Sequence, residues 1–200
     1  SGASSHKFSS GSFTEGRIAA KAALKYVLEH PEEPQVDMAA VKAMEEKILA
    51  PLDRFEQFKN ASTDPDINPN YLRPKMAMFR LQKIMDEYAG GVSTNFTCSK
   101  HSLEKALELL AMLKEDLELL AAEDLHELLR CWENVHRTWQ AEVHVRTMLF
   151  RQETRWPGYY FRSDCPEMNE DEWTVFVNSR WNPETGEWEM SKKPIHRIFV

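Results

Sequence analysis

The chain has 200 residues, of which 42% are hydrophobic and 28% charged, and its formal net charge is -7. This length and composition are typical of one globular domain with a substantial core and room for a small appendage. The negative charge argues against a nucleic-acid-binding surface, and no apolar run reaches the roughly 18 to 20 residues of a membrane span.

The three cysteines are Cys98, Cys131 and Cys165. They are far apart and form no C-x-x-C pair, so the sequence predicts neither a disulfide framework nor an iron–sulfur or zinc motif, and buried thiols are the default. The polar, serine-rich start of the chain lacks the apolar core of a signal peptide. We therefore expect a cytoplasmic protein.

The first predicted helix follows a loop of hydroxyl residues and glycine. Ser12 and Glu15 form the S-x-x-E capping-box pattern, which predicts a helix that begins at Ser12 and runs to about Glu29. The unpaired amides of its first turn would favour a phosphate, a carboxylate or the anionic edge of a reduced flavin. From the pattern alone, an ordinary capped helix is the commoner interpretation.

Two further helices are predicted before residue 90. Prolines in the segment 30–34 predict a linker, after which Asp37 caps a helix that Pro51 should kink. The spacing of its apolar residues predicts one buried stripe: Val41, Met44, Ile48, Leu52 and Phe55. After a polar loop over 60–69, residues 71–88 read as a third helix stopped by Gly90-Gly91. Its expected buried or partly buried residues are Met76, Phe79, Ile84, Met85 and Tyr88.

Residues 99–150 contain neither glycine nor proline and show strong helical periodicity. One stripe comprises Leu103, Leu107, Leu110, Leu113, Leu117 and Leu120, and the next comprises Leu125, Leu128, Trp132, Val135, Trp139 and Val143. These stripes predict a bundle of three or four helices.

The chain changes character after residue 151, where short segments rich in β-branched and aromatic residues predict strands. The predicted strands are Tyr159 to Arg162, Trp173 to Trp181, Glu187 to Met190 and Ile195 to Val200. Residues 182–186 (N-P-E-T-G) predict a hairpin loop with glycine in the left-handed region. The sequence therefore predicts a mainly α fold, a helical bundle followed by a small antiparallel β tail. The aromatic residues of this tail slightly favour a partner surface over ordinary packing.

Two Glu-x-x-His motifs, Glu123 to His126 and Glu133 to His136, are the kind that di-iron carboxylate bundles use. Both lie on one predicted helix, about 15 Å apart along its axis and turned by about 80°. A di-metal centre needs such motifs on facing helices, so we predict no metal site. Nucleotide-binding glycine motifs and hydrolase motifs are also absent from the sequence.

Two clusters retain plausible chemistry. In the opening loop, His6 and Lys7 place cationic or proton-carrying groups beside the predicted helix end, and Phe8 adds an aromatic surface. The second cluster, residues 151–164, gathers arginines and carboxylates where the last long helix turns into strands. For this cluster, a buried ion-pair network that fixes the junction is the favoured interpretation, and direct substrate contact is the alternative.

Together these clusters resemble the flavoprotein α subunit of dissimilatory adenylylsulfate reductases, within the wider fumarate reductase and succinate dehydrogenase group. That group has a flavin-contacting pattern like N-R-x-G-G-N-S-L-x-E, and residues 9–15 (S-S-G-S-F-T-E) lie over its second part. The group's asparagine and substrate-binding arginine fall on His6 and Lys7, which departs from the dicarboxylate enzymes. The second cluster resembles R-x-E-S-R-G-x-H-x-R-x-D, with residues 156–158 (W-P-G) inserted and no histidine.

The resemblance implies a reversible two-electron reduction of adenylylsulfate to sulfite and AMP on FAD, with electrons from a β subunit that holds the iron–sulfur clusters. It implies catalytic roles for His6 and Lys7, and substrate contacts from Phe8, stacking on adenine, and from Arg155. The implied FAD contacts are Ser9, Ser10, Gly11, Ser12 and Phe13. The direction of flux and the oligomeric state stay open.

The resemblance also implies a division of the chain. Residues 1–30 would end an FAD-binding domain, 31–151 would form a helical bundle domain, and 152–200 would form a hairpin tail that contacts a partner. The dinucleotide-binding unit of the family lies far upstream, so we expect the isolated 200 residues to be inactive, as the C-terminal part of a larger α/β flavoprotein. The alternative from another class is a free-standing helical scaffold or adaptor that binds a protein through its aromatic tail.

Overall fold

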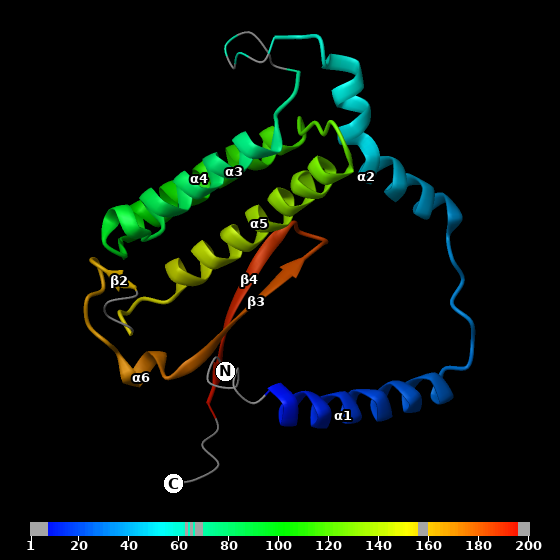
Figure 1. The fold of residues 1–200 in the computed structure, drawn as a ribbon. Helices are drawn as coiled ribbons and strands as arrows, with labels where there is room; N and C mark the ends of the chain where they lie inside the picture. Colours follow the sequence, from blue (N-terminus) through cyan, green and yellow to red (C-terminus); the bar gives the residue numbers. More distant parts are fainter. Residues whose placement is uncertain (1–7, 63, 65, 67–69, 156–159, 196–200) are drawn as a thin grey trace. The chain divides into compact units, whose positions relative to one another are not determined.

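The computed structural model describes residues 8–62, 64, 66, 70–155 and 160–195, with side chains from residue 12 onward. It is mainly helical, with an antiparallel hairpin near the end of the chain (Figure 1), which confirms the predicted fold class. By its internal contacts the chain forms two compact units, residues 1–44 and 45–200. The main helices are α1 (Phe8–Glu29), α2 (Met38–Phe58), α3 (Pro74–Tyr88), α4 (Lys100–Leu117) and α5 (Leu125–Phe150).

Helix α1 starts earlier than its sequence predicts. It begins at Phe8 and ends at the expected Glu29, so Ser12 lies inside the helix and the predicted capping box is wrong. Serine and glycine cost a helix at most about 1 kcal/mol each, which lets the helix extend through this segment. The predicted cap of α2 is confirmed, because the Asp37 carboxylate accepts from the amides of Ala39 (2.9 Å) and Ala40 (3.2 Å).

The first part of the described chain buries no side chain. Every described residue from Ser12 to Leu49 is exposed, including Val41, Met44 and Ile48 of the predicted α2 stripe at 46%, 55% and 41% exposure. The prediction that this half of the stripe is buried was therefore wrong, because no described segment covers it. The C-terminal half of the stripe, Leu52 and Phe55, is partly buried.

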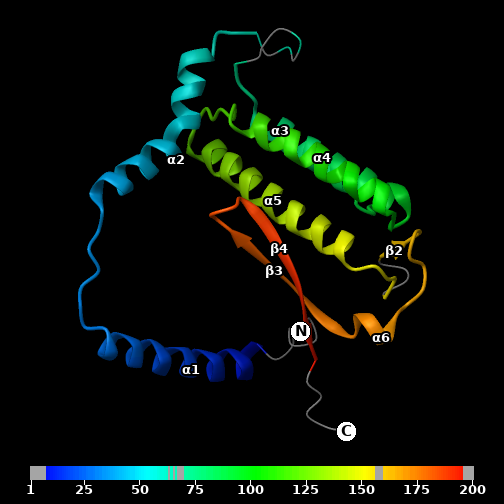
Figure 2. The same cartoon turned by 180° about the vertical axis from the view of Figure 1, so that it is seen from behind.

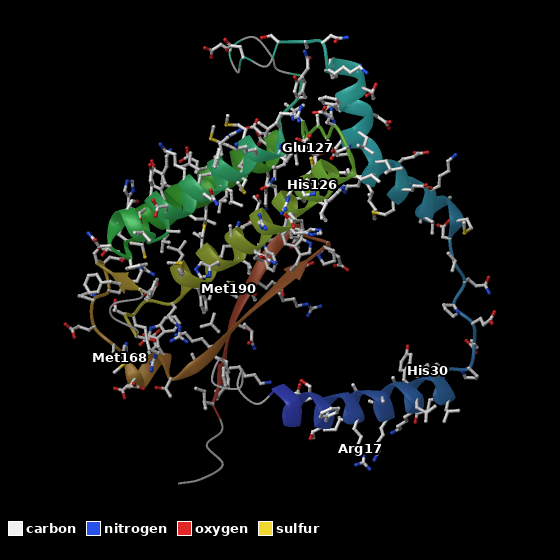
Figure 3. The ribbon with its side chains drawn as sticks, viewed as in Figure 1. Arg17, His30, His126, Glu127, Met168 and Met190 are labelled. Carbon is white, nitrogen blue, oxygen red and sulfur yellow. The ribbon has the colours of Figure 1, made fainter. Side chains whose placement is uncertain are left out.

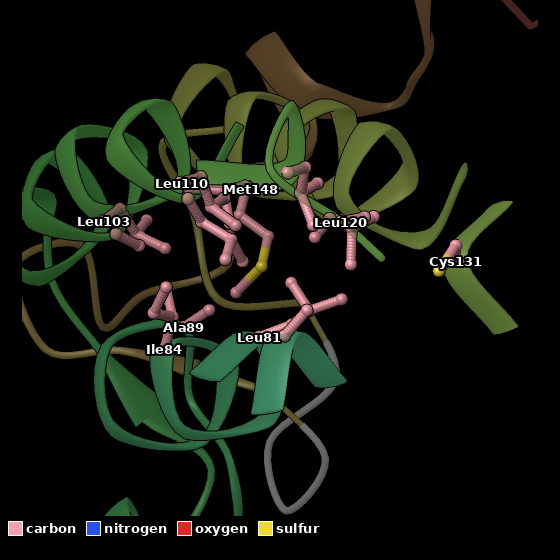
Figure 4. Packing of buried hydrophobic residues seen from close by; sticks show 14 of the residues in the cluster. Leu81, Ile84, Ala89, Leu103, Leu110, Leu120, Cys131 and Met148 are labelled. Carbon is pink, nitrogen blue, oxygen red and sulfur yellow. The ribbon is translucent and has the colours of Figure 1, made fainter. Parts of the chain in front are cut away.

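Helices α3, α4 and α5 pack together and form the core of the second unit (Figures 1 and 2). The leucine stripe of α4 is confirmed, since Leu103, Leu110 and Leu113 are at most 1% exposed. Figure 4 shows Leu103 and Leu110 in the same cluster as Leu81 and Ile84 of α3 and Met148 of α5. Apolar burial at about 25 cal/mol per Å² is the main force that holds the three helices together.

Other predicted core positions were wrong. Met76 and Phe79 of α3 are 47% and 48% exposed, and Leu125 and Trp139 of α5 are 71% and 41% exposed. On each of these helices the observed buried face is rotated about the helix axis from the predicted one. The buried face of α5 also includes polar residues. The buried faces comprise Ala77, Leu81 and Ile84 in α3, and Leu128, Cys131, Asn134, Thr138, Ala141, Glu142, Val145 and Met148 in α5.

Two hydrogen bonds attach the C-terminal half of α2 to this bundle. The Trp132 indole donates to the carbonyl of Ile48 (3.0 Å), and the amide of Ala122 donates to the carbonyl of Pro51 (2.9 Å). Pro51 is buried inside α2, and proline cannot donate the hydrogen bond that a helix expects at its position. The bundle therefore holds α2 at the place where its own backbone ladder is interrupted.

Short connections join the long helices. Gly90, with φ of 78°, stops α3 in the left-handed region, as predicted. The 3₁₀ helix η2 (Val92–Thr94) then leads into β1 (Thr97–Cys98), which pairs in parallel with β2 (Phe161–Arg162). The sequence did not predict β1, because a two-residue strand has no periodicity.

The chain ends in α6 (Glu170–Trp173) and the hairpin of β3 (Val175–Asn182) and β4 (Glu187–Pro194). The predicted loop is confirmed, with Gly186 at φ of 69°. Opposite residues Trp181 and Trp188 form an edge-to-face pair and pack against Trp139 of α5, with centroids 5.1 to 6.3 Å apart. These tryptophans are therefore engaged in packing within the chain, while residues 196–200 of the last predicted strand lie outside the described residues.

Candidate functional site

The opening segment carries most of the predicted site residues. His6 and Lys7 lie outside the described residues. Residues 8–11 have helical backbone, and their side chains are not described. Ser12 and Phe13 are exposed on α1, Phe13 by 81%. Because α1 begins at Phe8, the helical amides without a helical acceptor belong to residues 8–10 and not to Ser12 and Glu15.

The second cluster surrounds Glu153, which is fully buried just beyond the end of α5. Its carboxylate accepts from Arg155 at 2.7 and 3.1 Å, and also from Arg151 and from the amide of Asn169 (3.0 Å). Arg155 reaches on to Glu170 of α6 at 3.2 Å. This is the buried ion-pair network that the sequence favoured. Contact of Arg155 with a substrate stays a prediction.

Arg151 connects this network to the hairpin. Its guanidinium donates to the carbonyls of Trp173 (3.0 Å) and Val175 (2.9 Å), where α6 passes into β3. It also lies over the Trp173 ring, with Cζ 5.5 Å from the centroid, and Phe150 meets the same ring edge to face at 5.8 Å. One arginine therefore fixes the direction in which the chain leaves the bundle.

Arg162 joins two helix ends. Its side chain is 1% exposed and donates to both carboxylate oxygens of Asp164 (2.9 and 2.7 Å). It also donates to the carbonyls of Met148 and Arg151 at the end of α5, while Asp164 accepts from the amide of Lys100 (3.1 Å) at the start of α4. A cation at a helix C-terminus and an anion at an N-terminus both complement the helix dipole.

A cavity of about 290 Å³ opens beside this pair and is lined by Lys100, Leu149, Gln152, Arg162, Asp164 and Cys165. Nε, Nη1 and Nη2 of Arg162 are all engaged by protein acceptors. A guanidinium held in this way is satisfied without a ligand, so its chemistry here is to fix the junction of α4, α5 and β2.

The electrostatics agree with this role. Burial opposes ionisation of Glu153, but hydrogen bonds from Arg155, the Asn169 amide and Arg151 outweigh it and hold the pKa of Glu153 below its ordinary value. Hydrogen bonds from Arg162 lower the pKa of Asp164. Burial by itself lowers the pKa of Arg162, yet its pairing with Asp164 raises it overall. Each member of the network is therefore charged near neutral pH.

These shifts predict a pH dependence of stability. A carboxylate whose pKa is lowered by folding stabilises the protein fully above its unfolded pKa of about 4.3 and loses this contribution as the pH falls through the lower folded pKa. We expect the unfolding midpoint in urea to be level between about pH 6 and 7 and to fall below about pH 4.5. Glu153→Gln should flatten part of this acid limb, and an unchanged limb in that variant would contradict the assignment.

The Glu-x-x-His motifs have other partners. Glu123 and Glu127 accept from Arg73 at 3.1 and 2.6 Å. Glu127 is the neighbour of His126 at the start of α5 (Figure 3). Glu133 pairs with Arg130 and Arg137 on its own helix. Within the part of the chain that the structure describes, no group of three His, Cys, Asp or Glu residues is placed to hold a metal ion.

None of the helices in the described ranges combines the length and the apolar character that crossing a membrane requires.

Comparisons with known proteins define the class. The family model of the C-terminal region of fumarate reductase flavoproteins matches residues 78–200. The chain therefore belongs to this family of flavoproteins. Its fold is also similar to that of Mycobacterium smegmatis Sdh1 in the apo form, with a TM-score of 0.62 at 20% identity over 88% of this chain and 27% of that one.

Within the class, the chain is most usefully compared with adenylylsulfate reductases. It is 44% identical over 198 residues to the adenylylsulfate reductase subunit alpha of Megalodesulfovibrio gigas, covering 99% of this chain and 30% of that protein. The structure of adenylylsulfate reductase from Archaeoglobus fulgidus matches with a TM-score of 0.88 at 57% identity, over 96% of this chain and 30% of that one. A structure of adenosine-5-phosphosulfate reductase with sulfite as a covalent adduct gives the same values. The chain thus spans about a third of the length of these relatives.

Proposed function

We propose that the chain is the C-terminal portion of the FAD-containing α subunit of an adenylylsulfate reductase, which reduces adenylylsulfate reversibly to sulfite and AMP by two electrons. The main support is that the chain is much more similar in sequence to an adenylylsulfate reductase than to another protein of the same fold. Identity is 57% over 96% of the chain to an adenylylsulfate reductase, but 20% to Sdh1, which has the same fold. The tryptophans of the hairpin pack within the chain, so no observation favours the adaptor alternative.

Under this proposal the chain has three parts, the first of which contains α1. We assign residues 1–30 to the end of the FAD-binding domain, residues 31–151 to a helical domain and residues 152–200 to a tail that contacts a partner. The exposure of every described residue in 12–30 supports the first assignment, because helices in proteins owe most of their stability to packing against other segments. The remainder of the subunit would cover the apolar residues of α1, such as Leu24 and Val27.

The start of α1 supports two of the proposed flavin contacts. The helical amides without a helical acceptor are those of residues 8–10, so Ser9 and Ser10 offer backbone donors that suit an anionic flavin edge. The amides of Ser12 and Phe13 lie deeper in the helix, so these residues fit the cofactor less well. FAD, when bound, supplies the two-electron chemistry. His6 and Lys7 would offset the charge of the sulfate group.

Electrons would come from an iron–sulfur β subunit. Cys98, Cys131 and Cys165 form no C-x-x-C pair, and the described residues place no three His, Cys, Asp or Glu side chains together to hold a metal ion. Iron–sulfur clusters are ligated by thiolates. This supports a division of labour in which the clusters belong to the partner, and we place the complex in the cytoplasm.

Phe8 offers a direct test in the complete subunit with its partner. If its ring stacks on the adenine of adenylylsulfate, Phe8→Ala should raise the KM about tenfold, since base stacking on an aromatic side chain contributes about 1–3 kcal/mol. Steady-state assays of AMP-dependent sulfite oxidation and of the reverse reaction would measure this. The control is Phe79→Ala, which removes a 48% exposed ring on α3 and should leave the KM unchanged in both directions.

An unchanged KM in Phe8→Ala would remove the stacking role. The proposed function itself has a separate test, because the complete wild-type protein should show the absorbance of a bound flavin and should form AMP and sulfite from adenylylsulfate. A flavoprotein that reduces fumarate instead would overturn it.

A further inference from the structure

A second cavity lies between the C-terminal half of α2 and helices α4 and α5, apart from the network around Glu153. Its volume is about 230 Å³. Trp132 and Trp139 of α5 and Leu117 of α4 supply apolar walls, and Lys47 and Arg54 of α2 supply two cations. Lys47 and Arg54 are seven residues apart, so they lie on one face of the helix about 10 Å from each other.

Arg54 differs from the buried arginines of the junction. Its Nε is buried and has no hydrogen-bond partner among the described residues. Arg162 and Arg155, by contrast, each bind a carboxylate within 3.1 Å. A buried polar group without a partner destabilises a folded protein, and such groups in native proteins usually have a partner. The cavity therefore lacks an acceptor that Arg54 requires.

The volume of the cavity limits the kind of acceptor that can fit in it. Cofactor and substrate pockets usually measure about 300–1,000 Å³, so 230 Å³ is too small for adenylylsulfate or AMP and suits one or two side chains. Beside it on α2, Ile48 and Leu49 are 41% and 36% exposed, which extends the apolar surface beyond the cavity. These dimensions fit a protein segment that carries both apolar residues and a carboxylate.

We propose that this cavity receives an acidic, partly apolar segment from the rest of the subunit, whose carboxylate binds Arg54 between the two tryptophans. The inference rests on the proposed function, because it takes the chain to be part of a longer polypeptide. The available length supports it, since the chain accounts for only 30% of the relatives it matches. Glu118 also lines the cavity. Its single negative charge is outnumbered by the positive charges of Lys47 and Arg54, so the site is net positive.

The test is Arg54→Met in the complete subunit, which keeps an apolar stem and removes the charge. If a carboxylate from the subunit is paired with Arg54, the variant leaves that carboxylate buried alone, and the thermal midpoint should fall by several degrees. If the cavity is empty, removing Arg54, whose buried Nε has no partner among the described residues, should leave the midpoint unchanged or raise it. An occupied cavity therefore predicts a lower thermal midpoint in the variant, and an empty cavity predicts an unchanged or higher one. Arg180→Met, at an exposed arginine on β3, is the control and should not change the midpoint.

Arg54→Lys keeps the charge and should restore part of the loss, and it replaces the methionine variant if that one does not fold. A midpoint for Arg54→Lys above that of the wild type would count against the segment. A small anion is the remaining occupant, and it would make the midpoint of the wild-type subunit rise with added benzoate. We expect no such rise, and observing one would overturn the proposal. Activity with adenylylsulfate, measured on the same wild-type protein, tests the proposed function independently.

Discussion

Replacing Arg162 with methionine is expected to lower the free energy of unfolding by about 3–5 kcal/mol. The substitution leaves Asp164 without its bidentate partner and removes the donor of the Arg151 carbonyl at the end of α5. The Met148 carbonyl loses one of its two side-chain donors and keeps the Tyr160 hydroxyl (3.3 Å). The cost arises mainly at the buried Arg162, whose charge-assisted hydrogen bonds each contribute about 1.5–3 kcal/mol and are all lost, whereas Asp164 is exposed and water can solvate it. Urea unfolding of the complete subunit, followed by circular dichroism, would measure the loss.

The matched control is Arg137→Met. Arg137 is 47% exposed at its side chain and pairs with Glu133 on its own helix at 3.4 Å. An exposed pair of this kind contributes at most about 1 kcal/mol. Equal losses in the two variants would contradict the role of Arg162 in joining the ends of α4 and α5. The loss should also shrink as the pH falls from the unfolded Asp pKa of about 3.9 through the lower pKa that Arg162 gives Asp164 in the folded protein, because a protonated Asp164 no longer pairs with the guanidinium.

Leu110→Ala is expected to lower the free energy of unfolding by about 2–5 kcal/mol. Leu110 is 1% exposed in the middle of α4 and belongs to the core between α3, α4 and α5 (Figure 4). Truncation removes apolar contacts and leaves a cavity that the rigid helices around it cannot close completely. The measurement is the same urea titration, with the slope of the unfolding transition compared between variants.

Leu129→Ala is the control for this core prediction. Leu129 is 55% exposed on α5, so the same chemical change removes few contacts and should cost less than about 0.5–1 kcal/mol. A cost for Leu110→Ala no larger than that of the control would show that α4 is not packed as described.

The sequence predicted most accurately where one periodic signal covers many residues. The leucines of α4 are spaced three and four apart, and they are buried as this spacing requires. The hairpin loop was also predictable, because a glycine in the left-handed region has a local cause. Boundaries were predicted less well, as at Ser12, because a capping pattern states only that a helix can begin there.

The buried face of α5 shows why other positions were missed. Asn134 and Thr138 are 3% and 0% exposed, although both are polar. Asn134 donates to the carbonyl of Pro74 on α3 (2.8 Å), and Thr138 donates to the carbonyl of Asn134 (2.8 Å). These acceptors satisfy the polar groups inside the core, and such partners cannot be recognised from hydrophobic spacing. Trp139, which the spacing predicted as buried, instead supports the hairpin.

The arginine cluster after α5 was likewise predictable only in part. Its composition indicated an ion-pair network, but the sequence could not say that Arg162 would reach back to Met148 and that Asp164 would cap α4, 64 residues earlier than its own position. Strand β1, which places Cys98 opposite Arg162, was also invisible in the sequence. Each of these contacts joins residues far apart in the chain, so each exists only once the helices have packed.

By itself, the sequence determined the helical character of the chain, the leucine face of α4, the hairpin and the resemblance of the two clusters to a flavoprotein, because local spacing and short motifs carry these properties. Only the tertiary structure decided that Glu153 and Arg162 are buried with partners, that the hairpin tryptophans rest on α5, and that Arg54 faces a cavity without an acceptor. The physical reason is that burial and pairing depend on which distant residues meet, and the spacing within one helix does not contain that information.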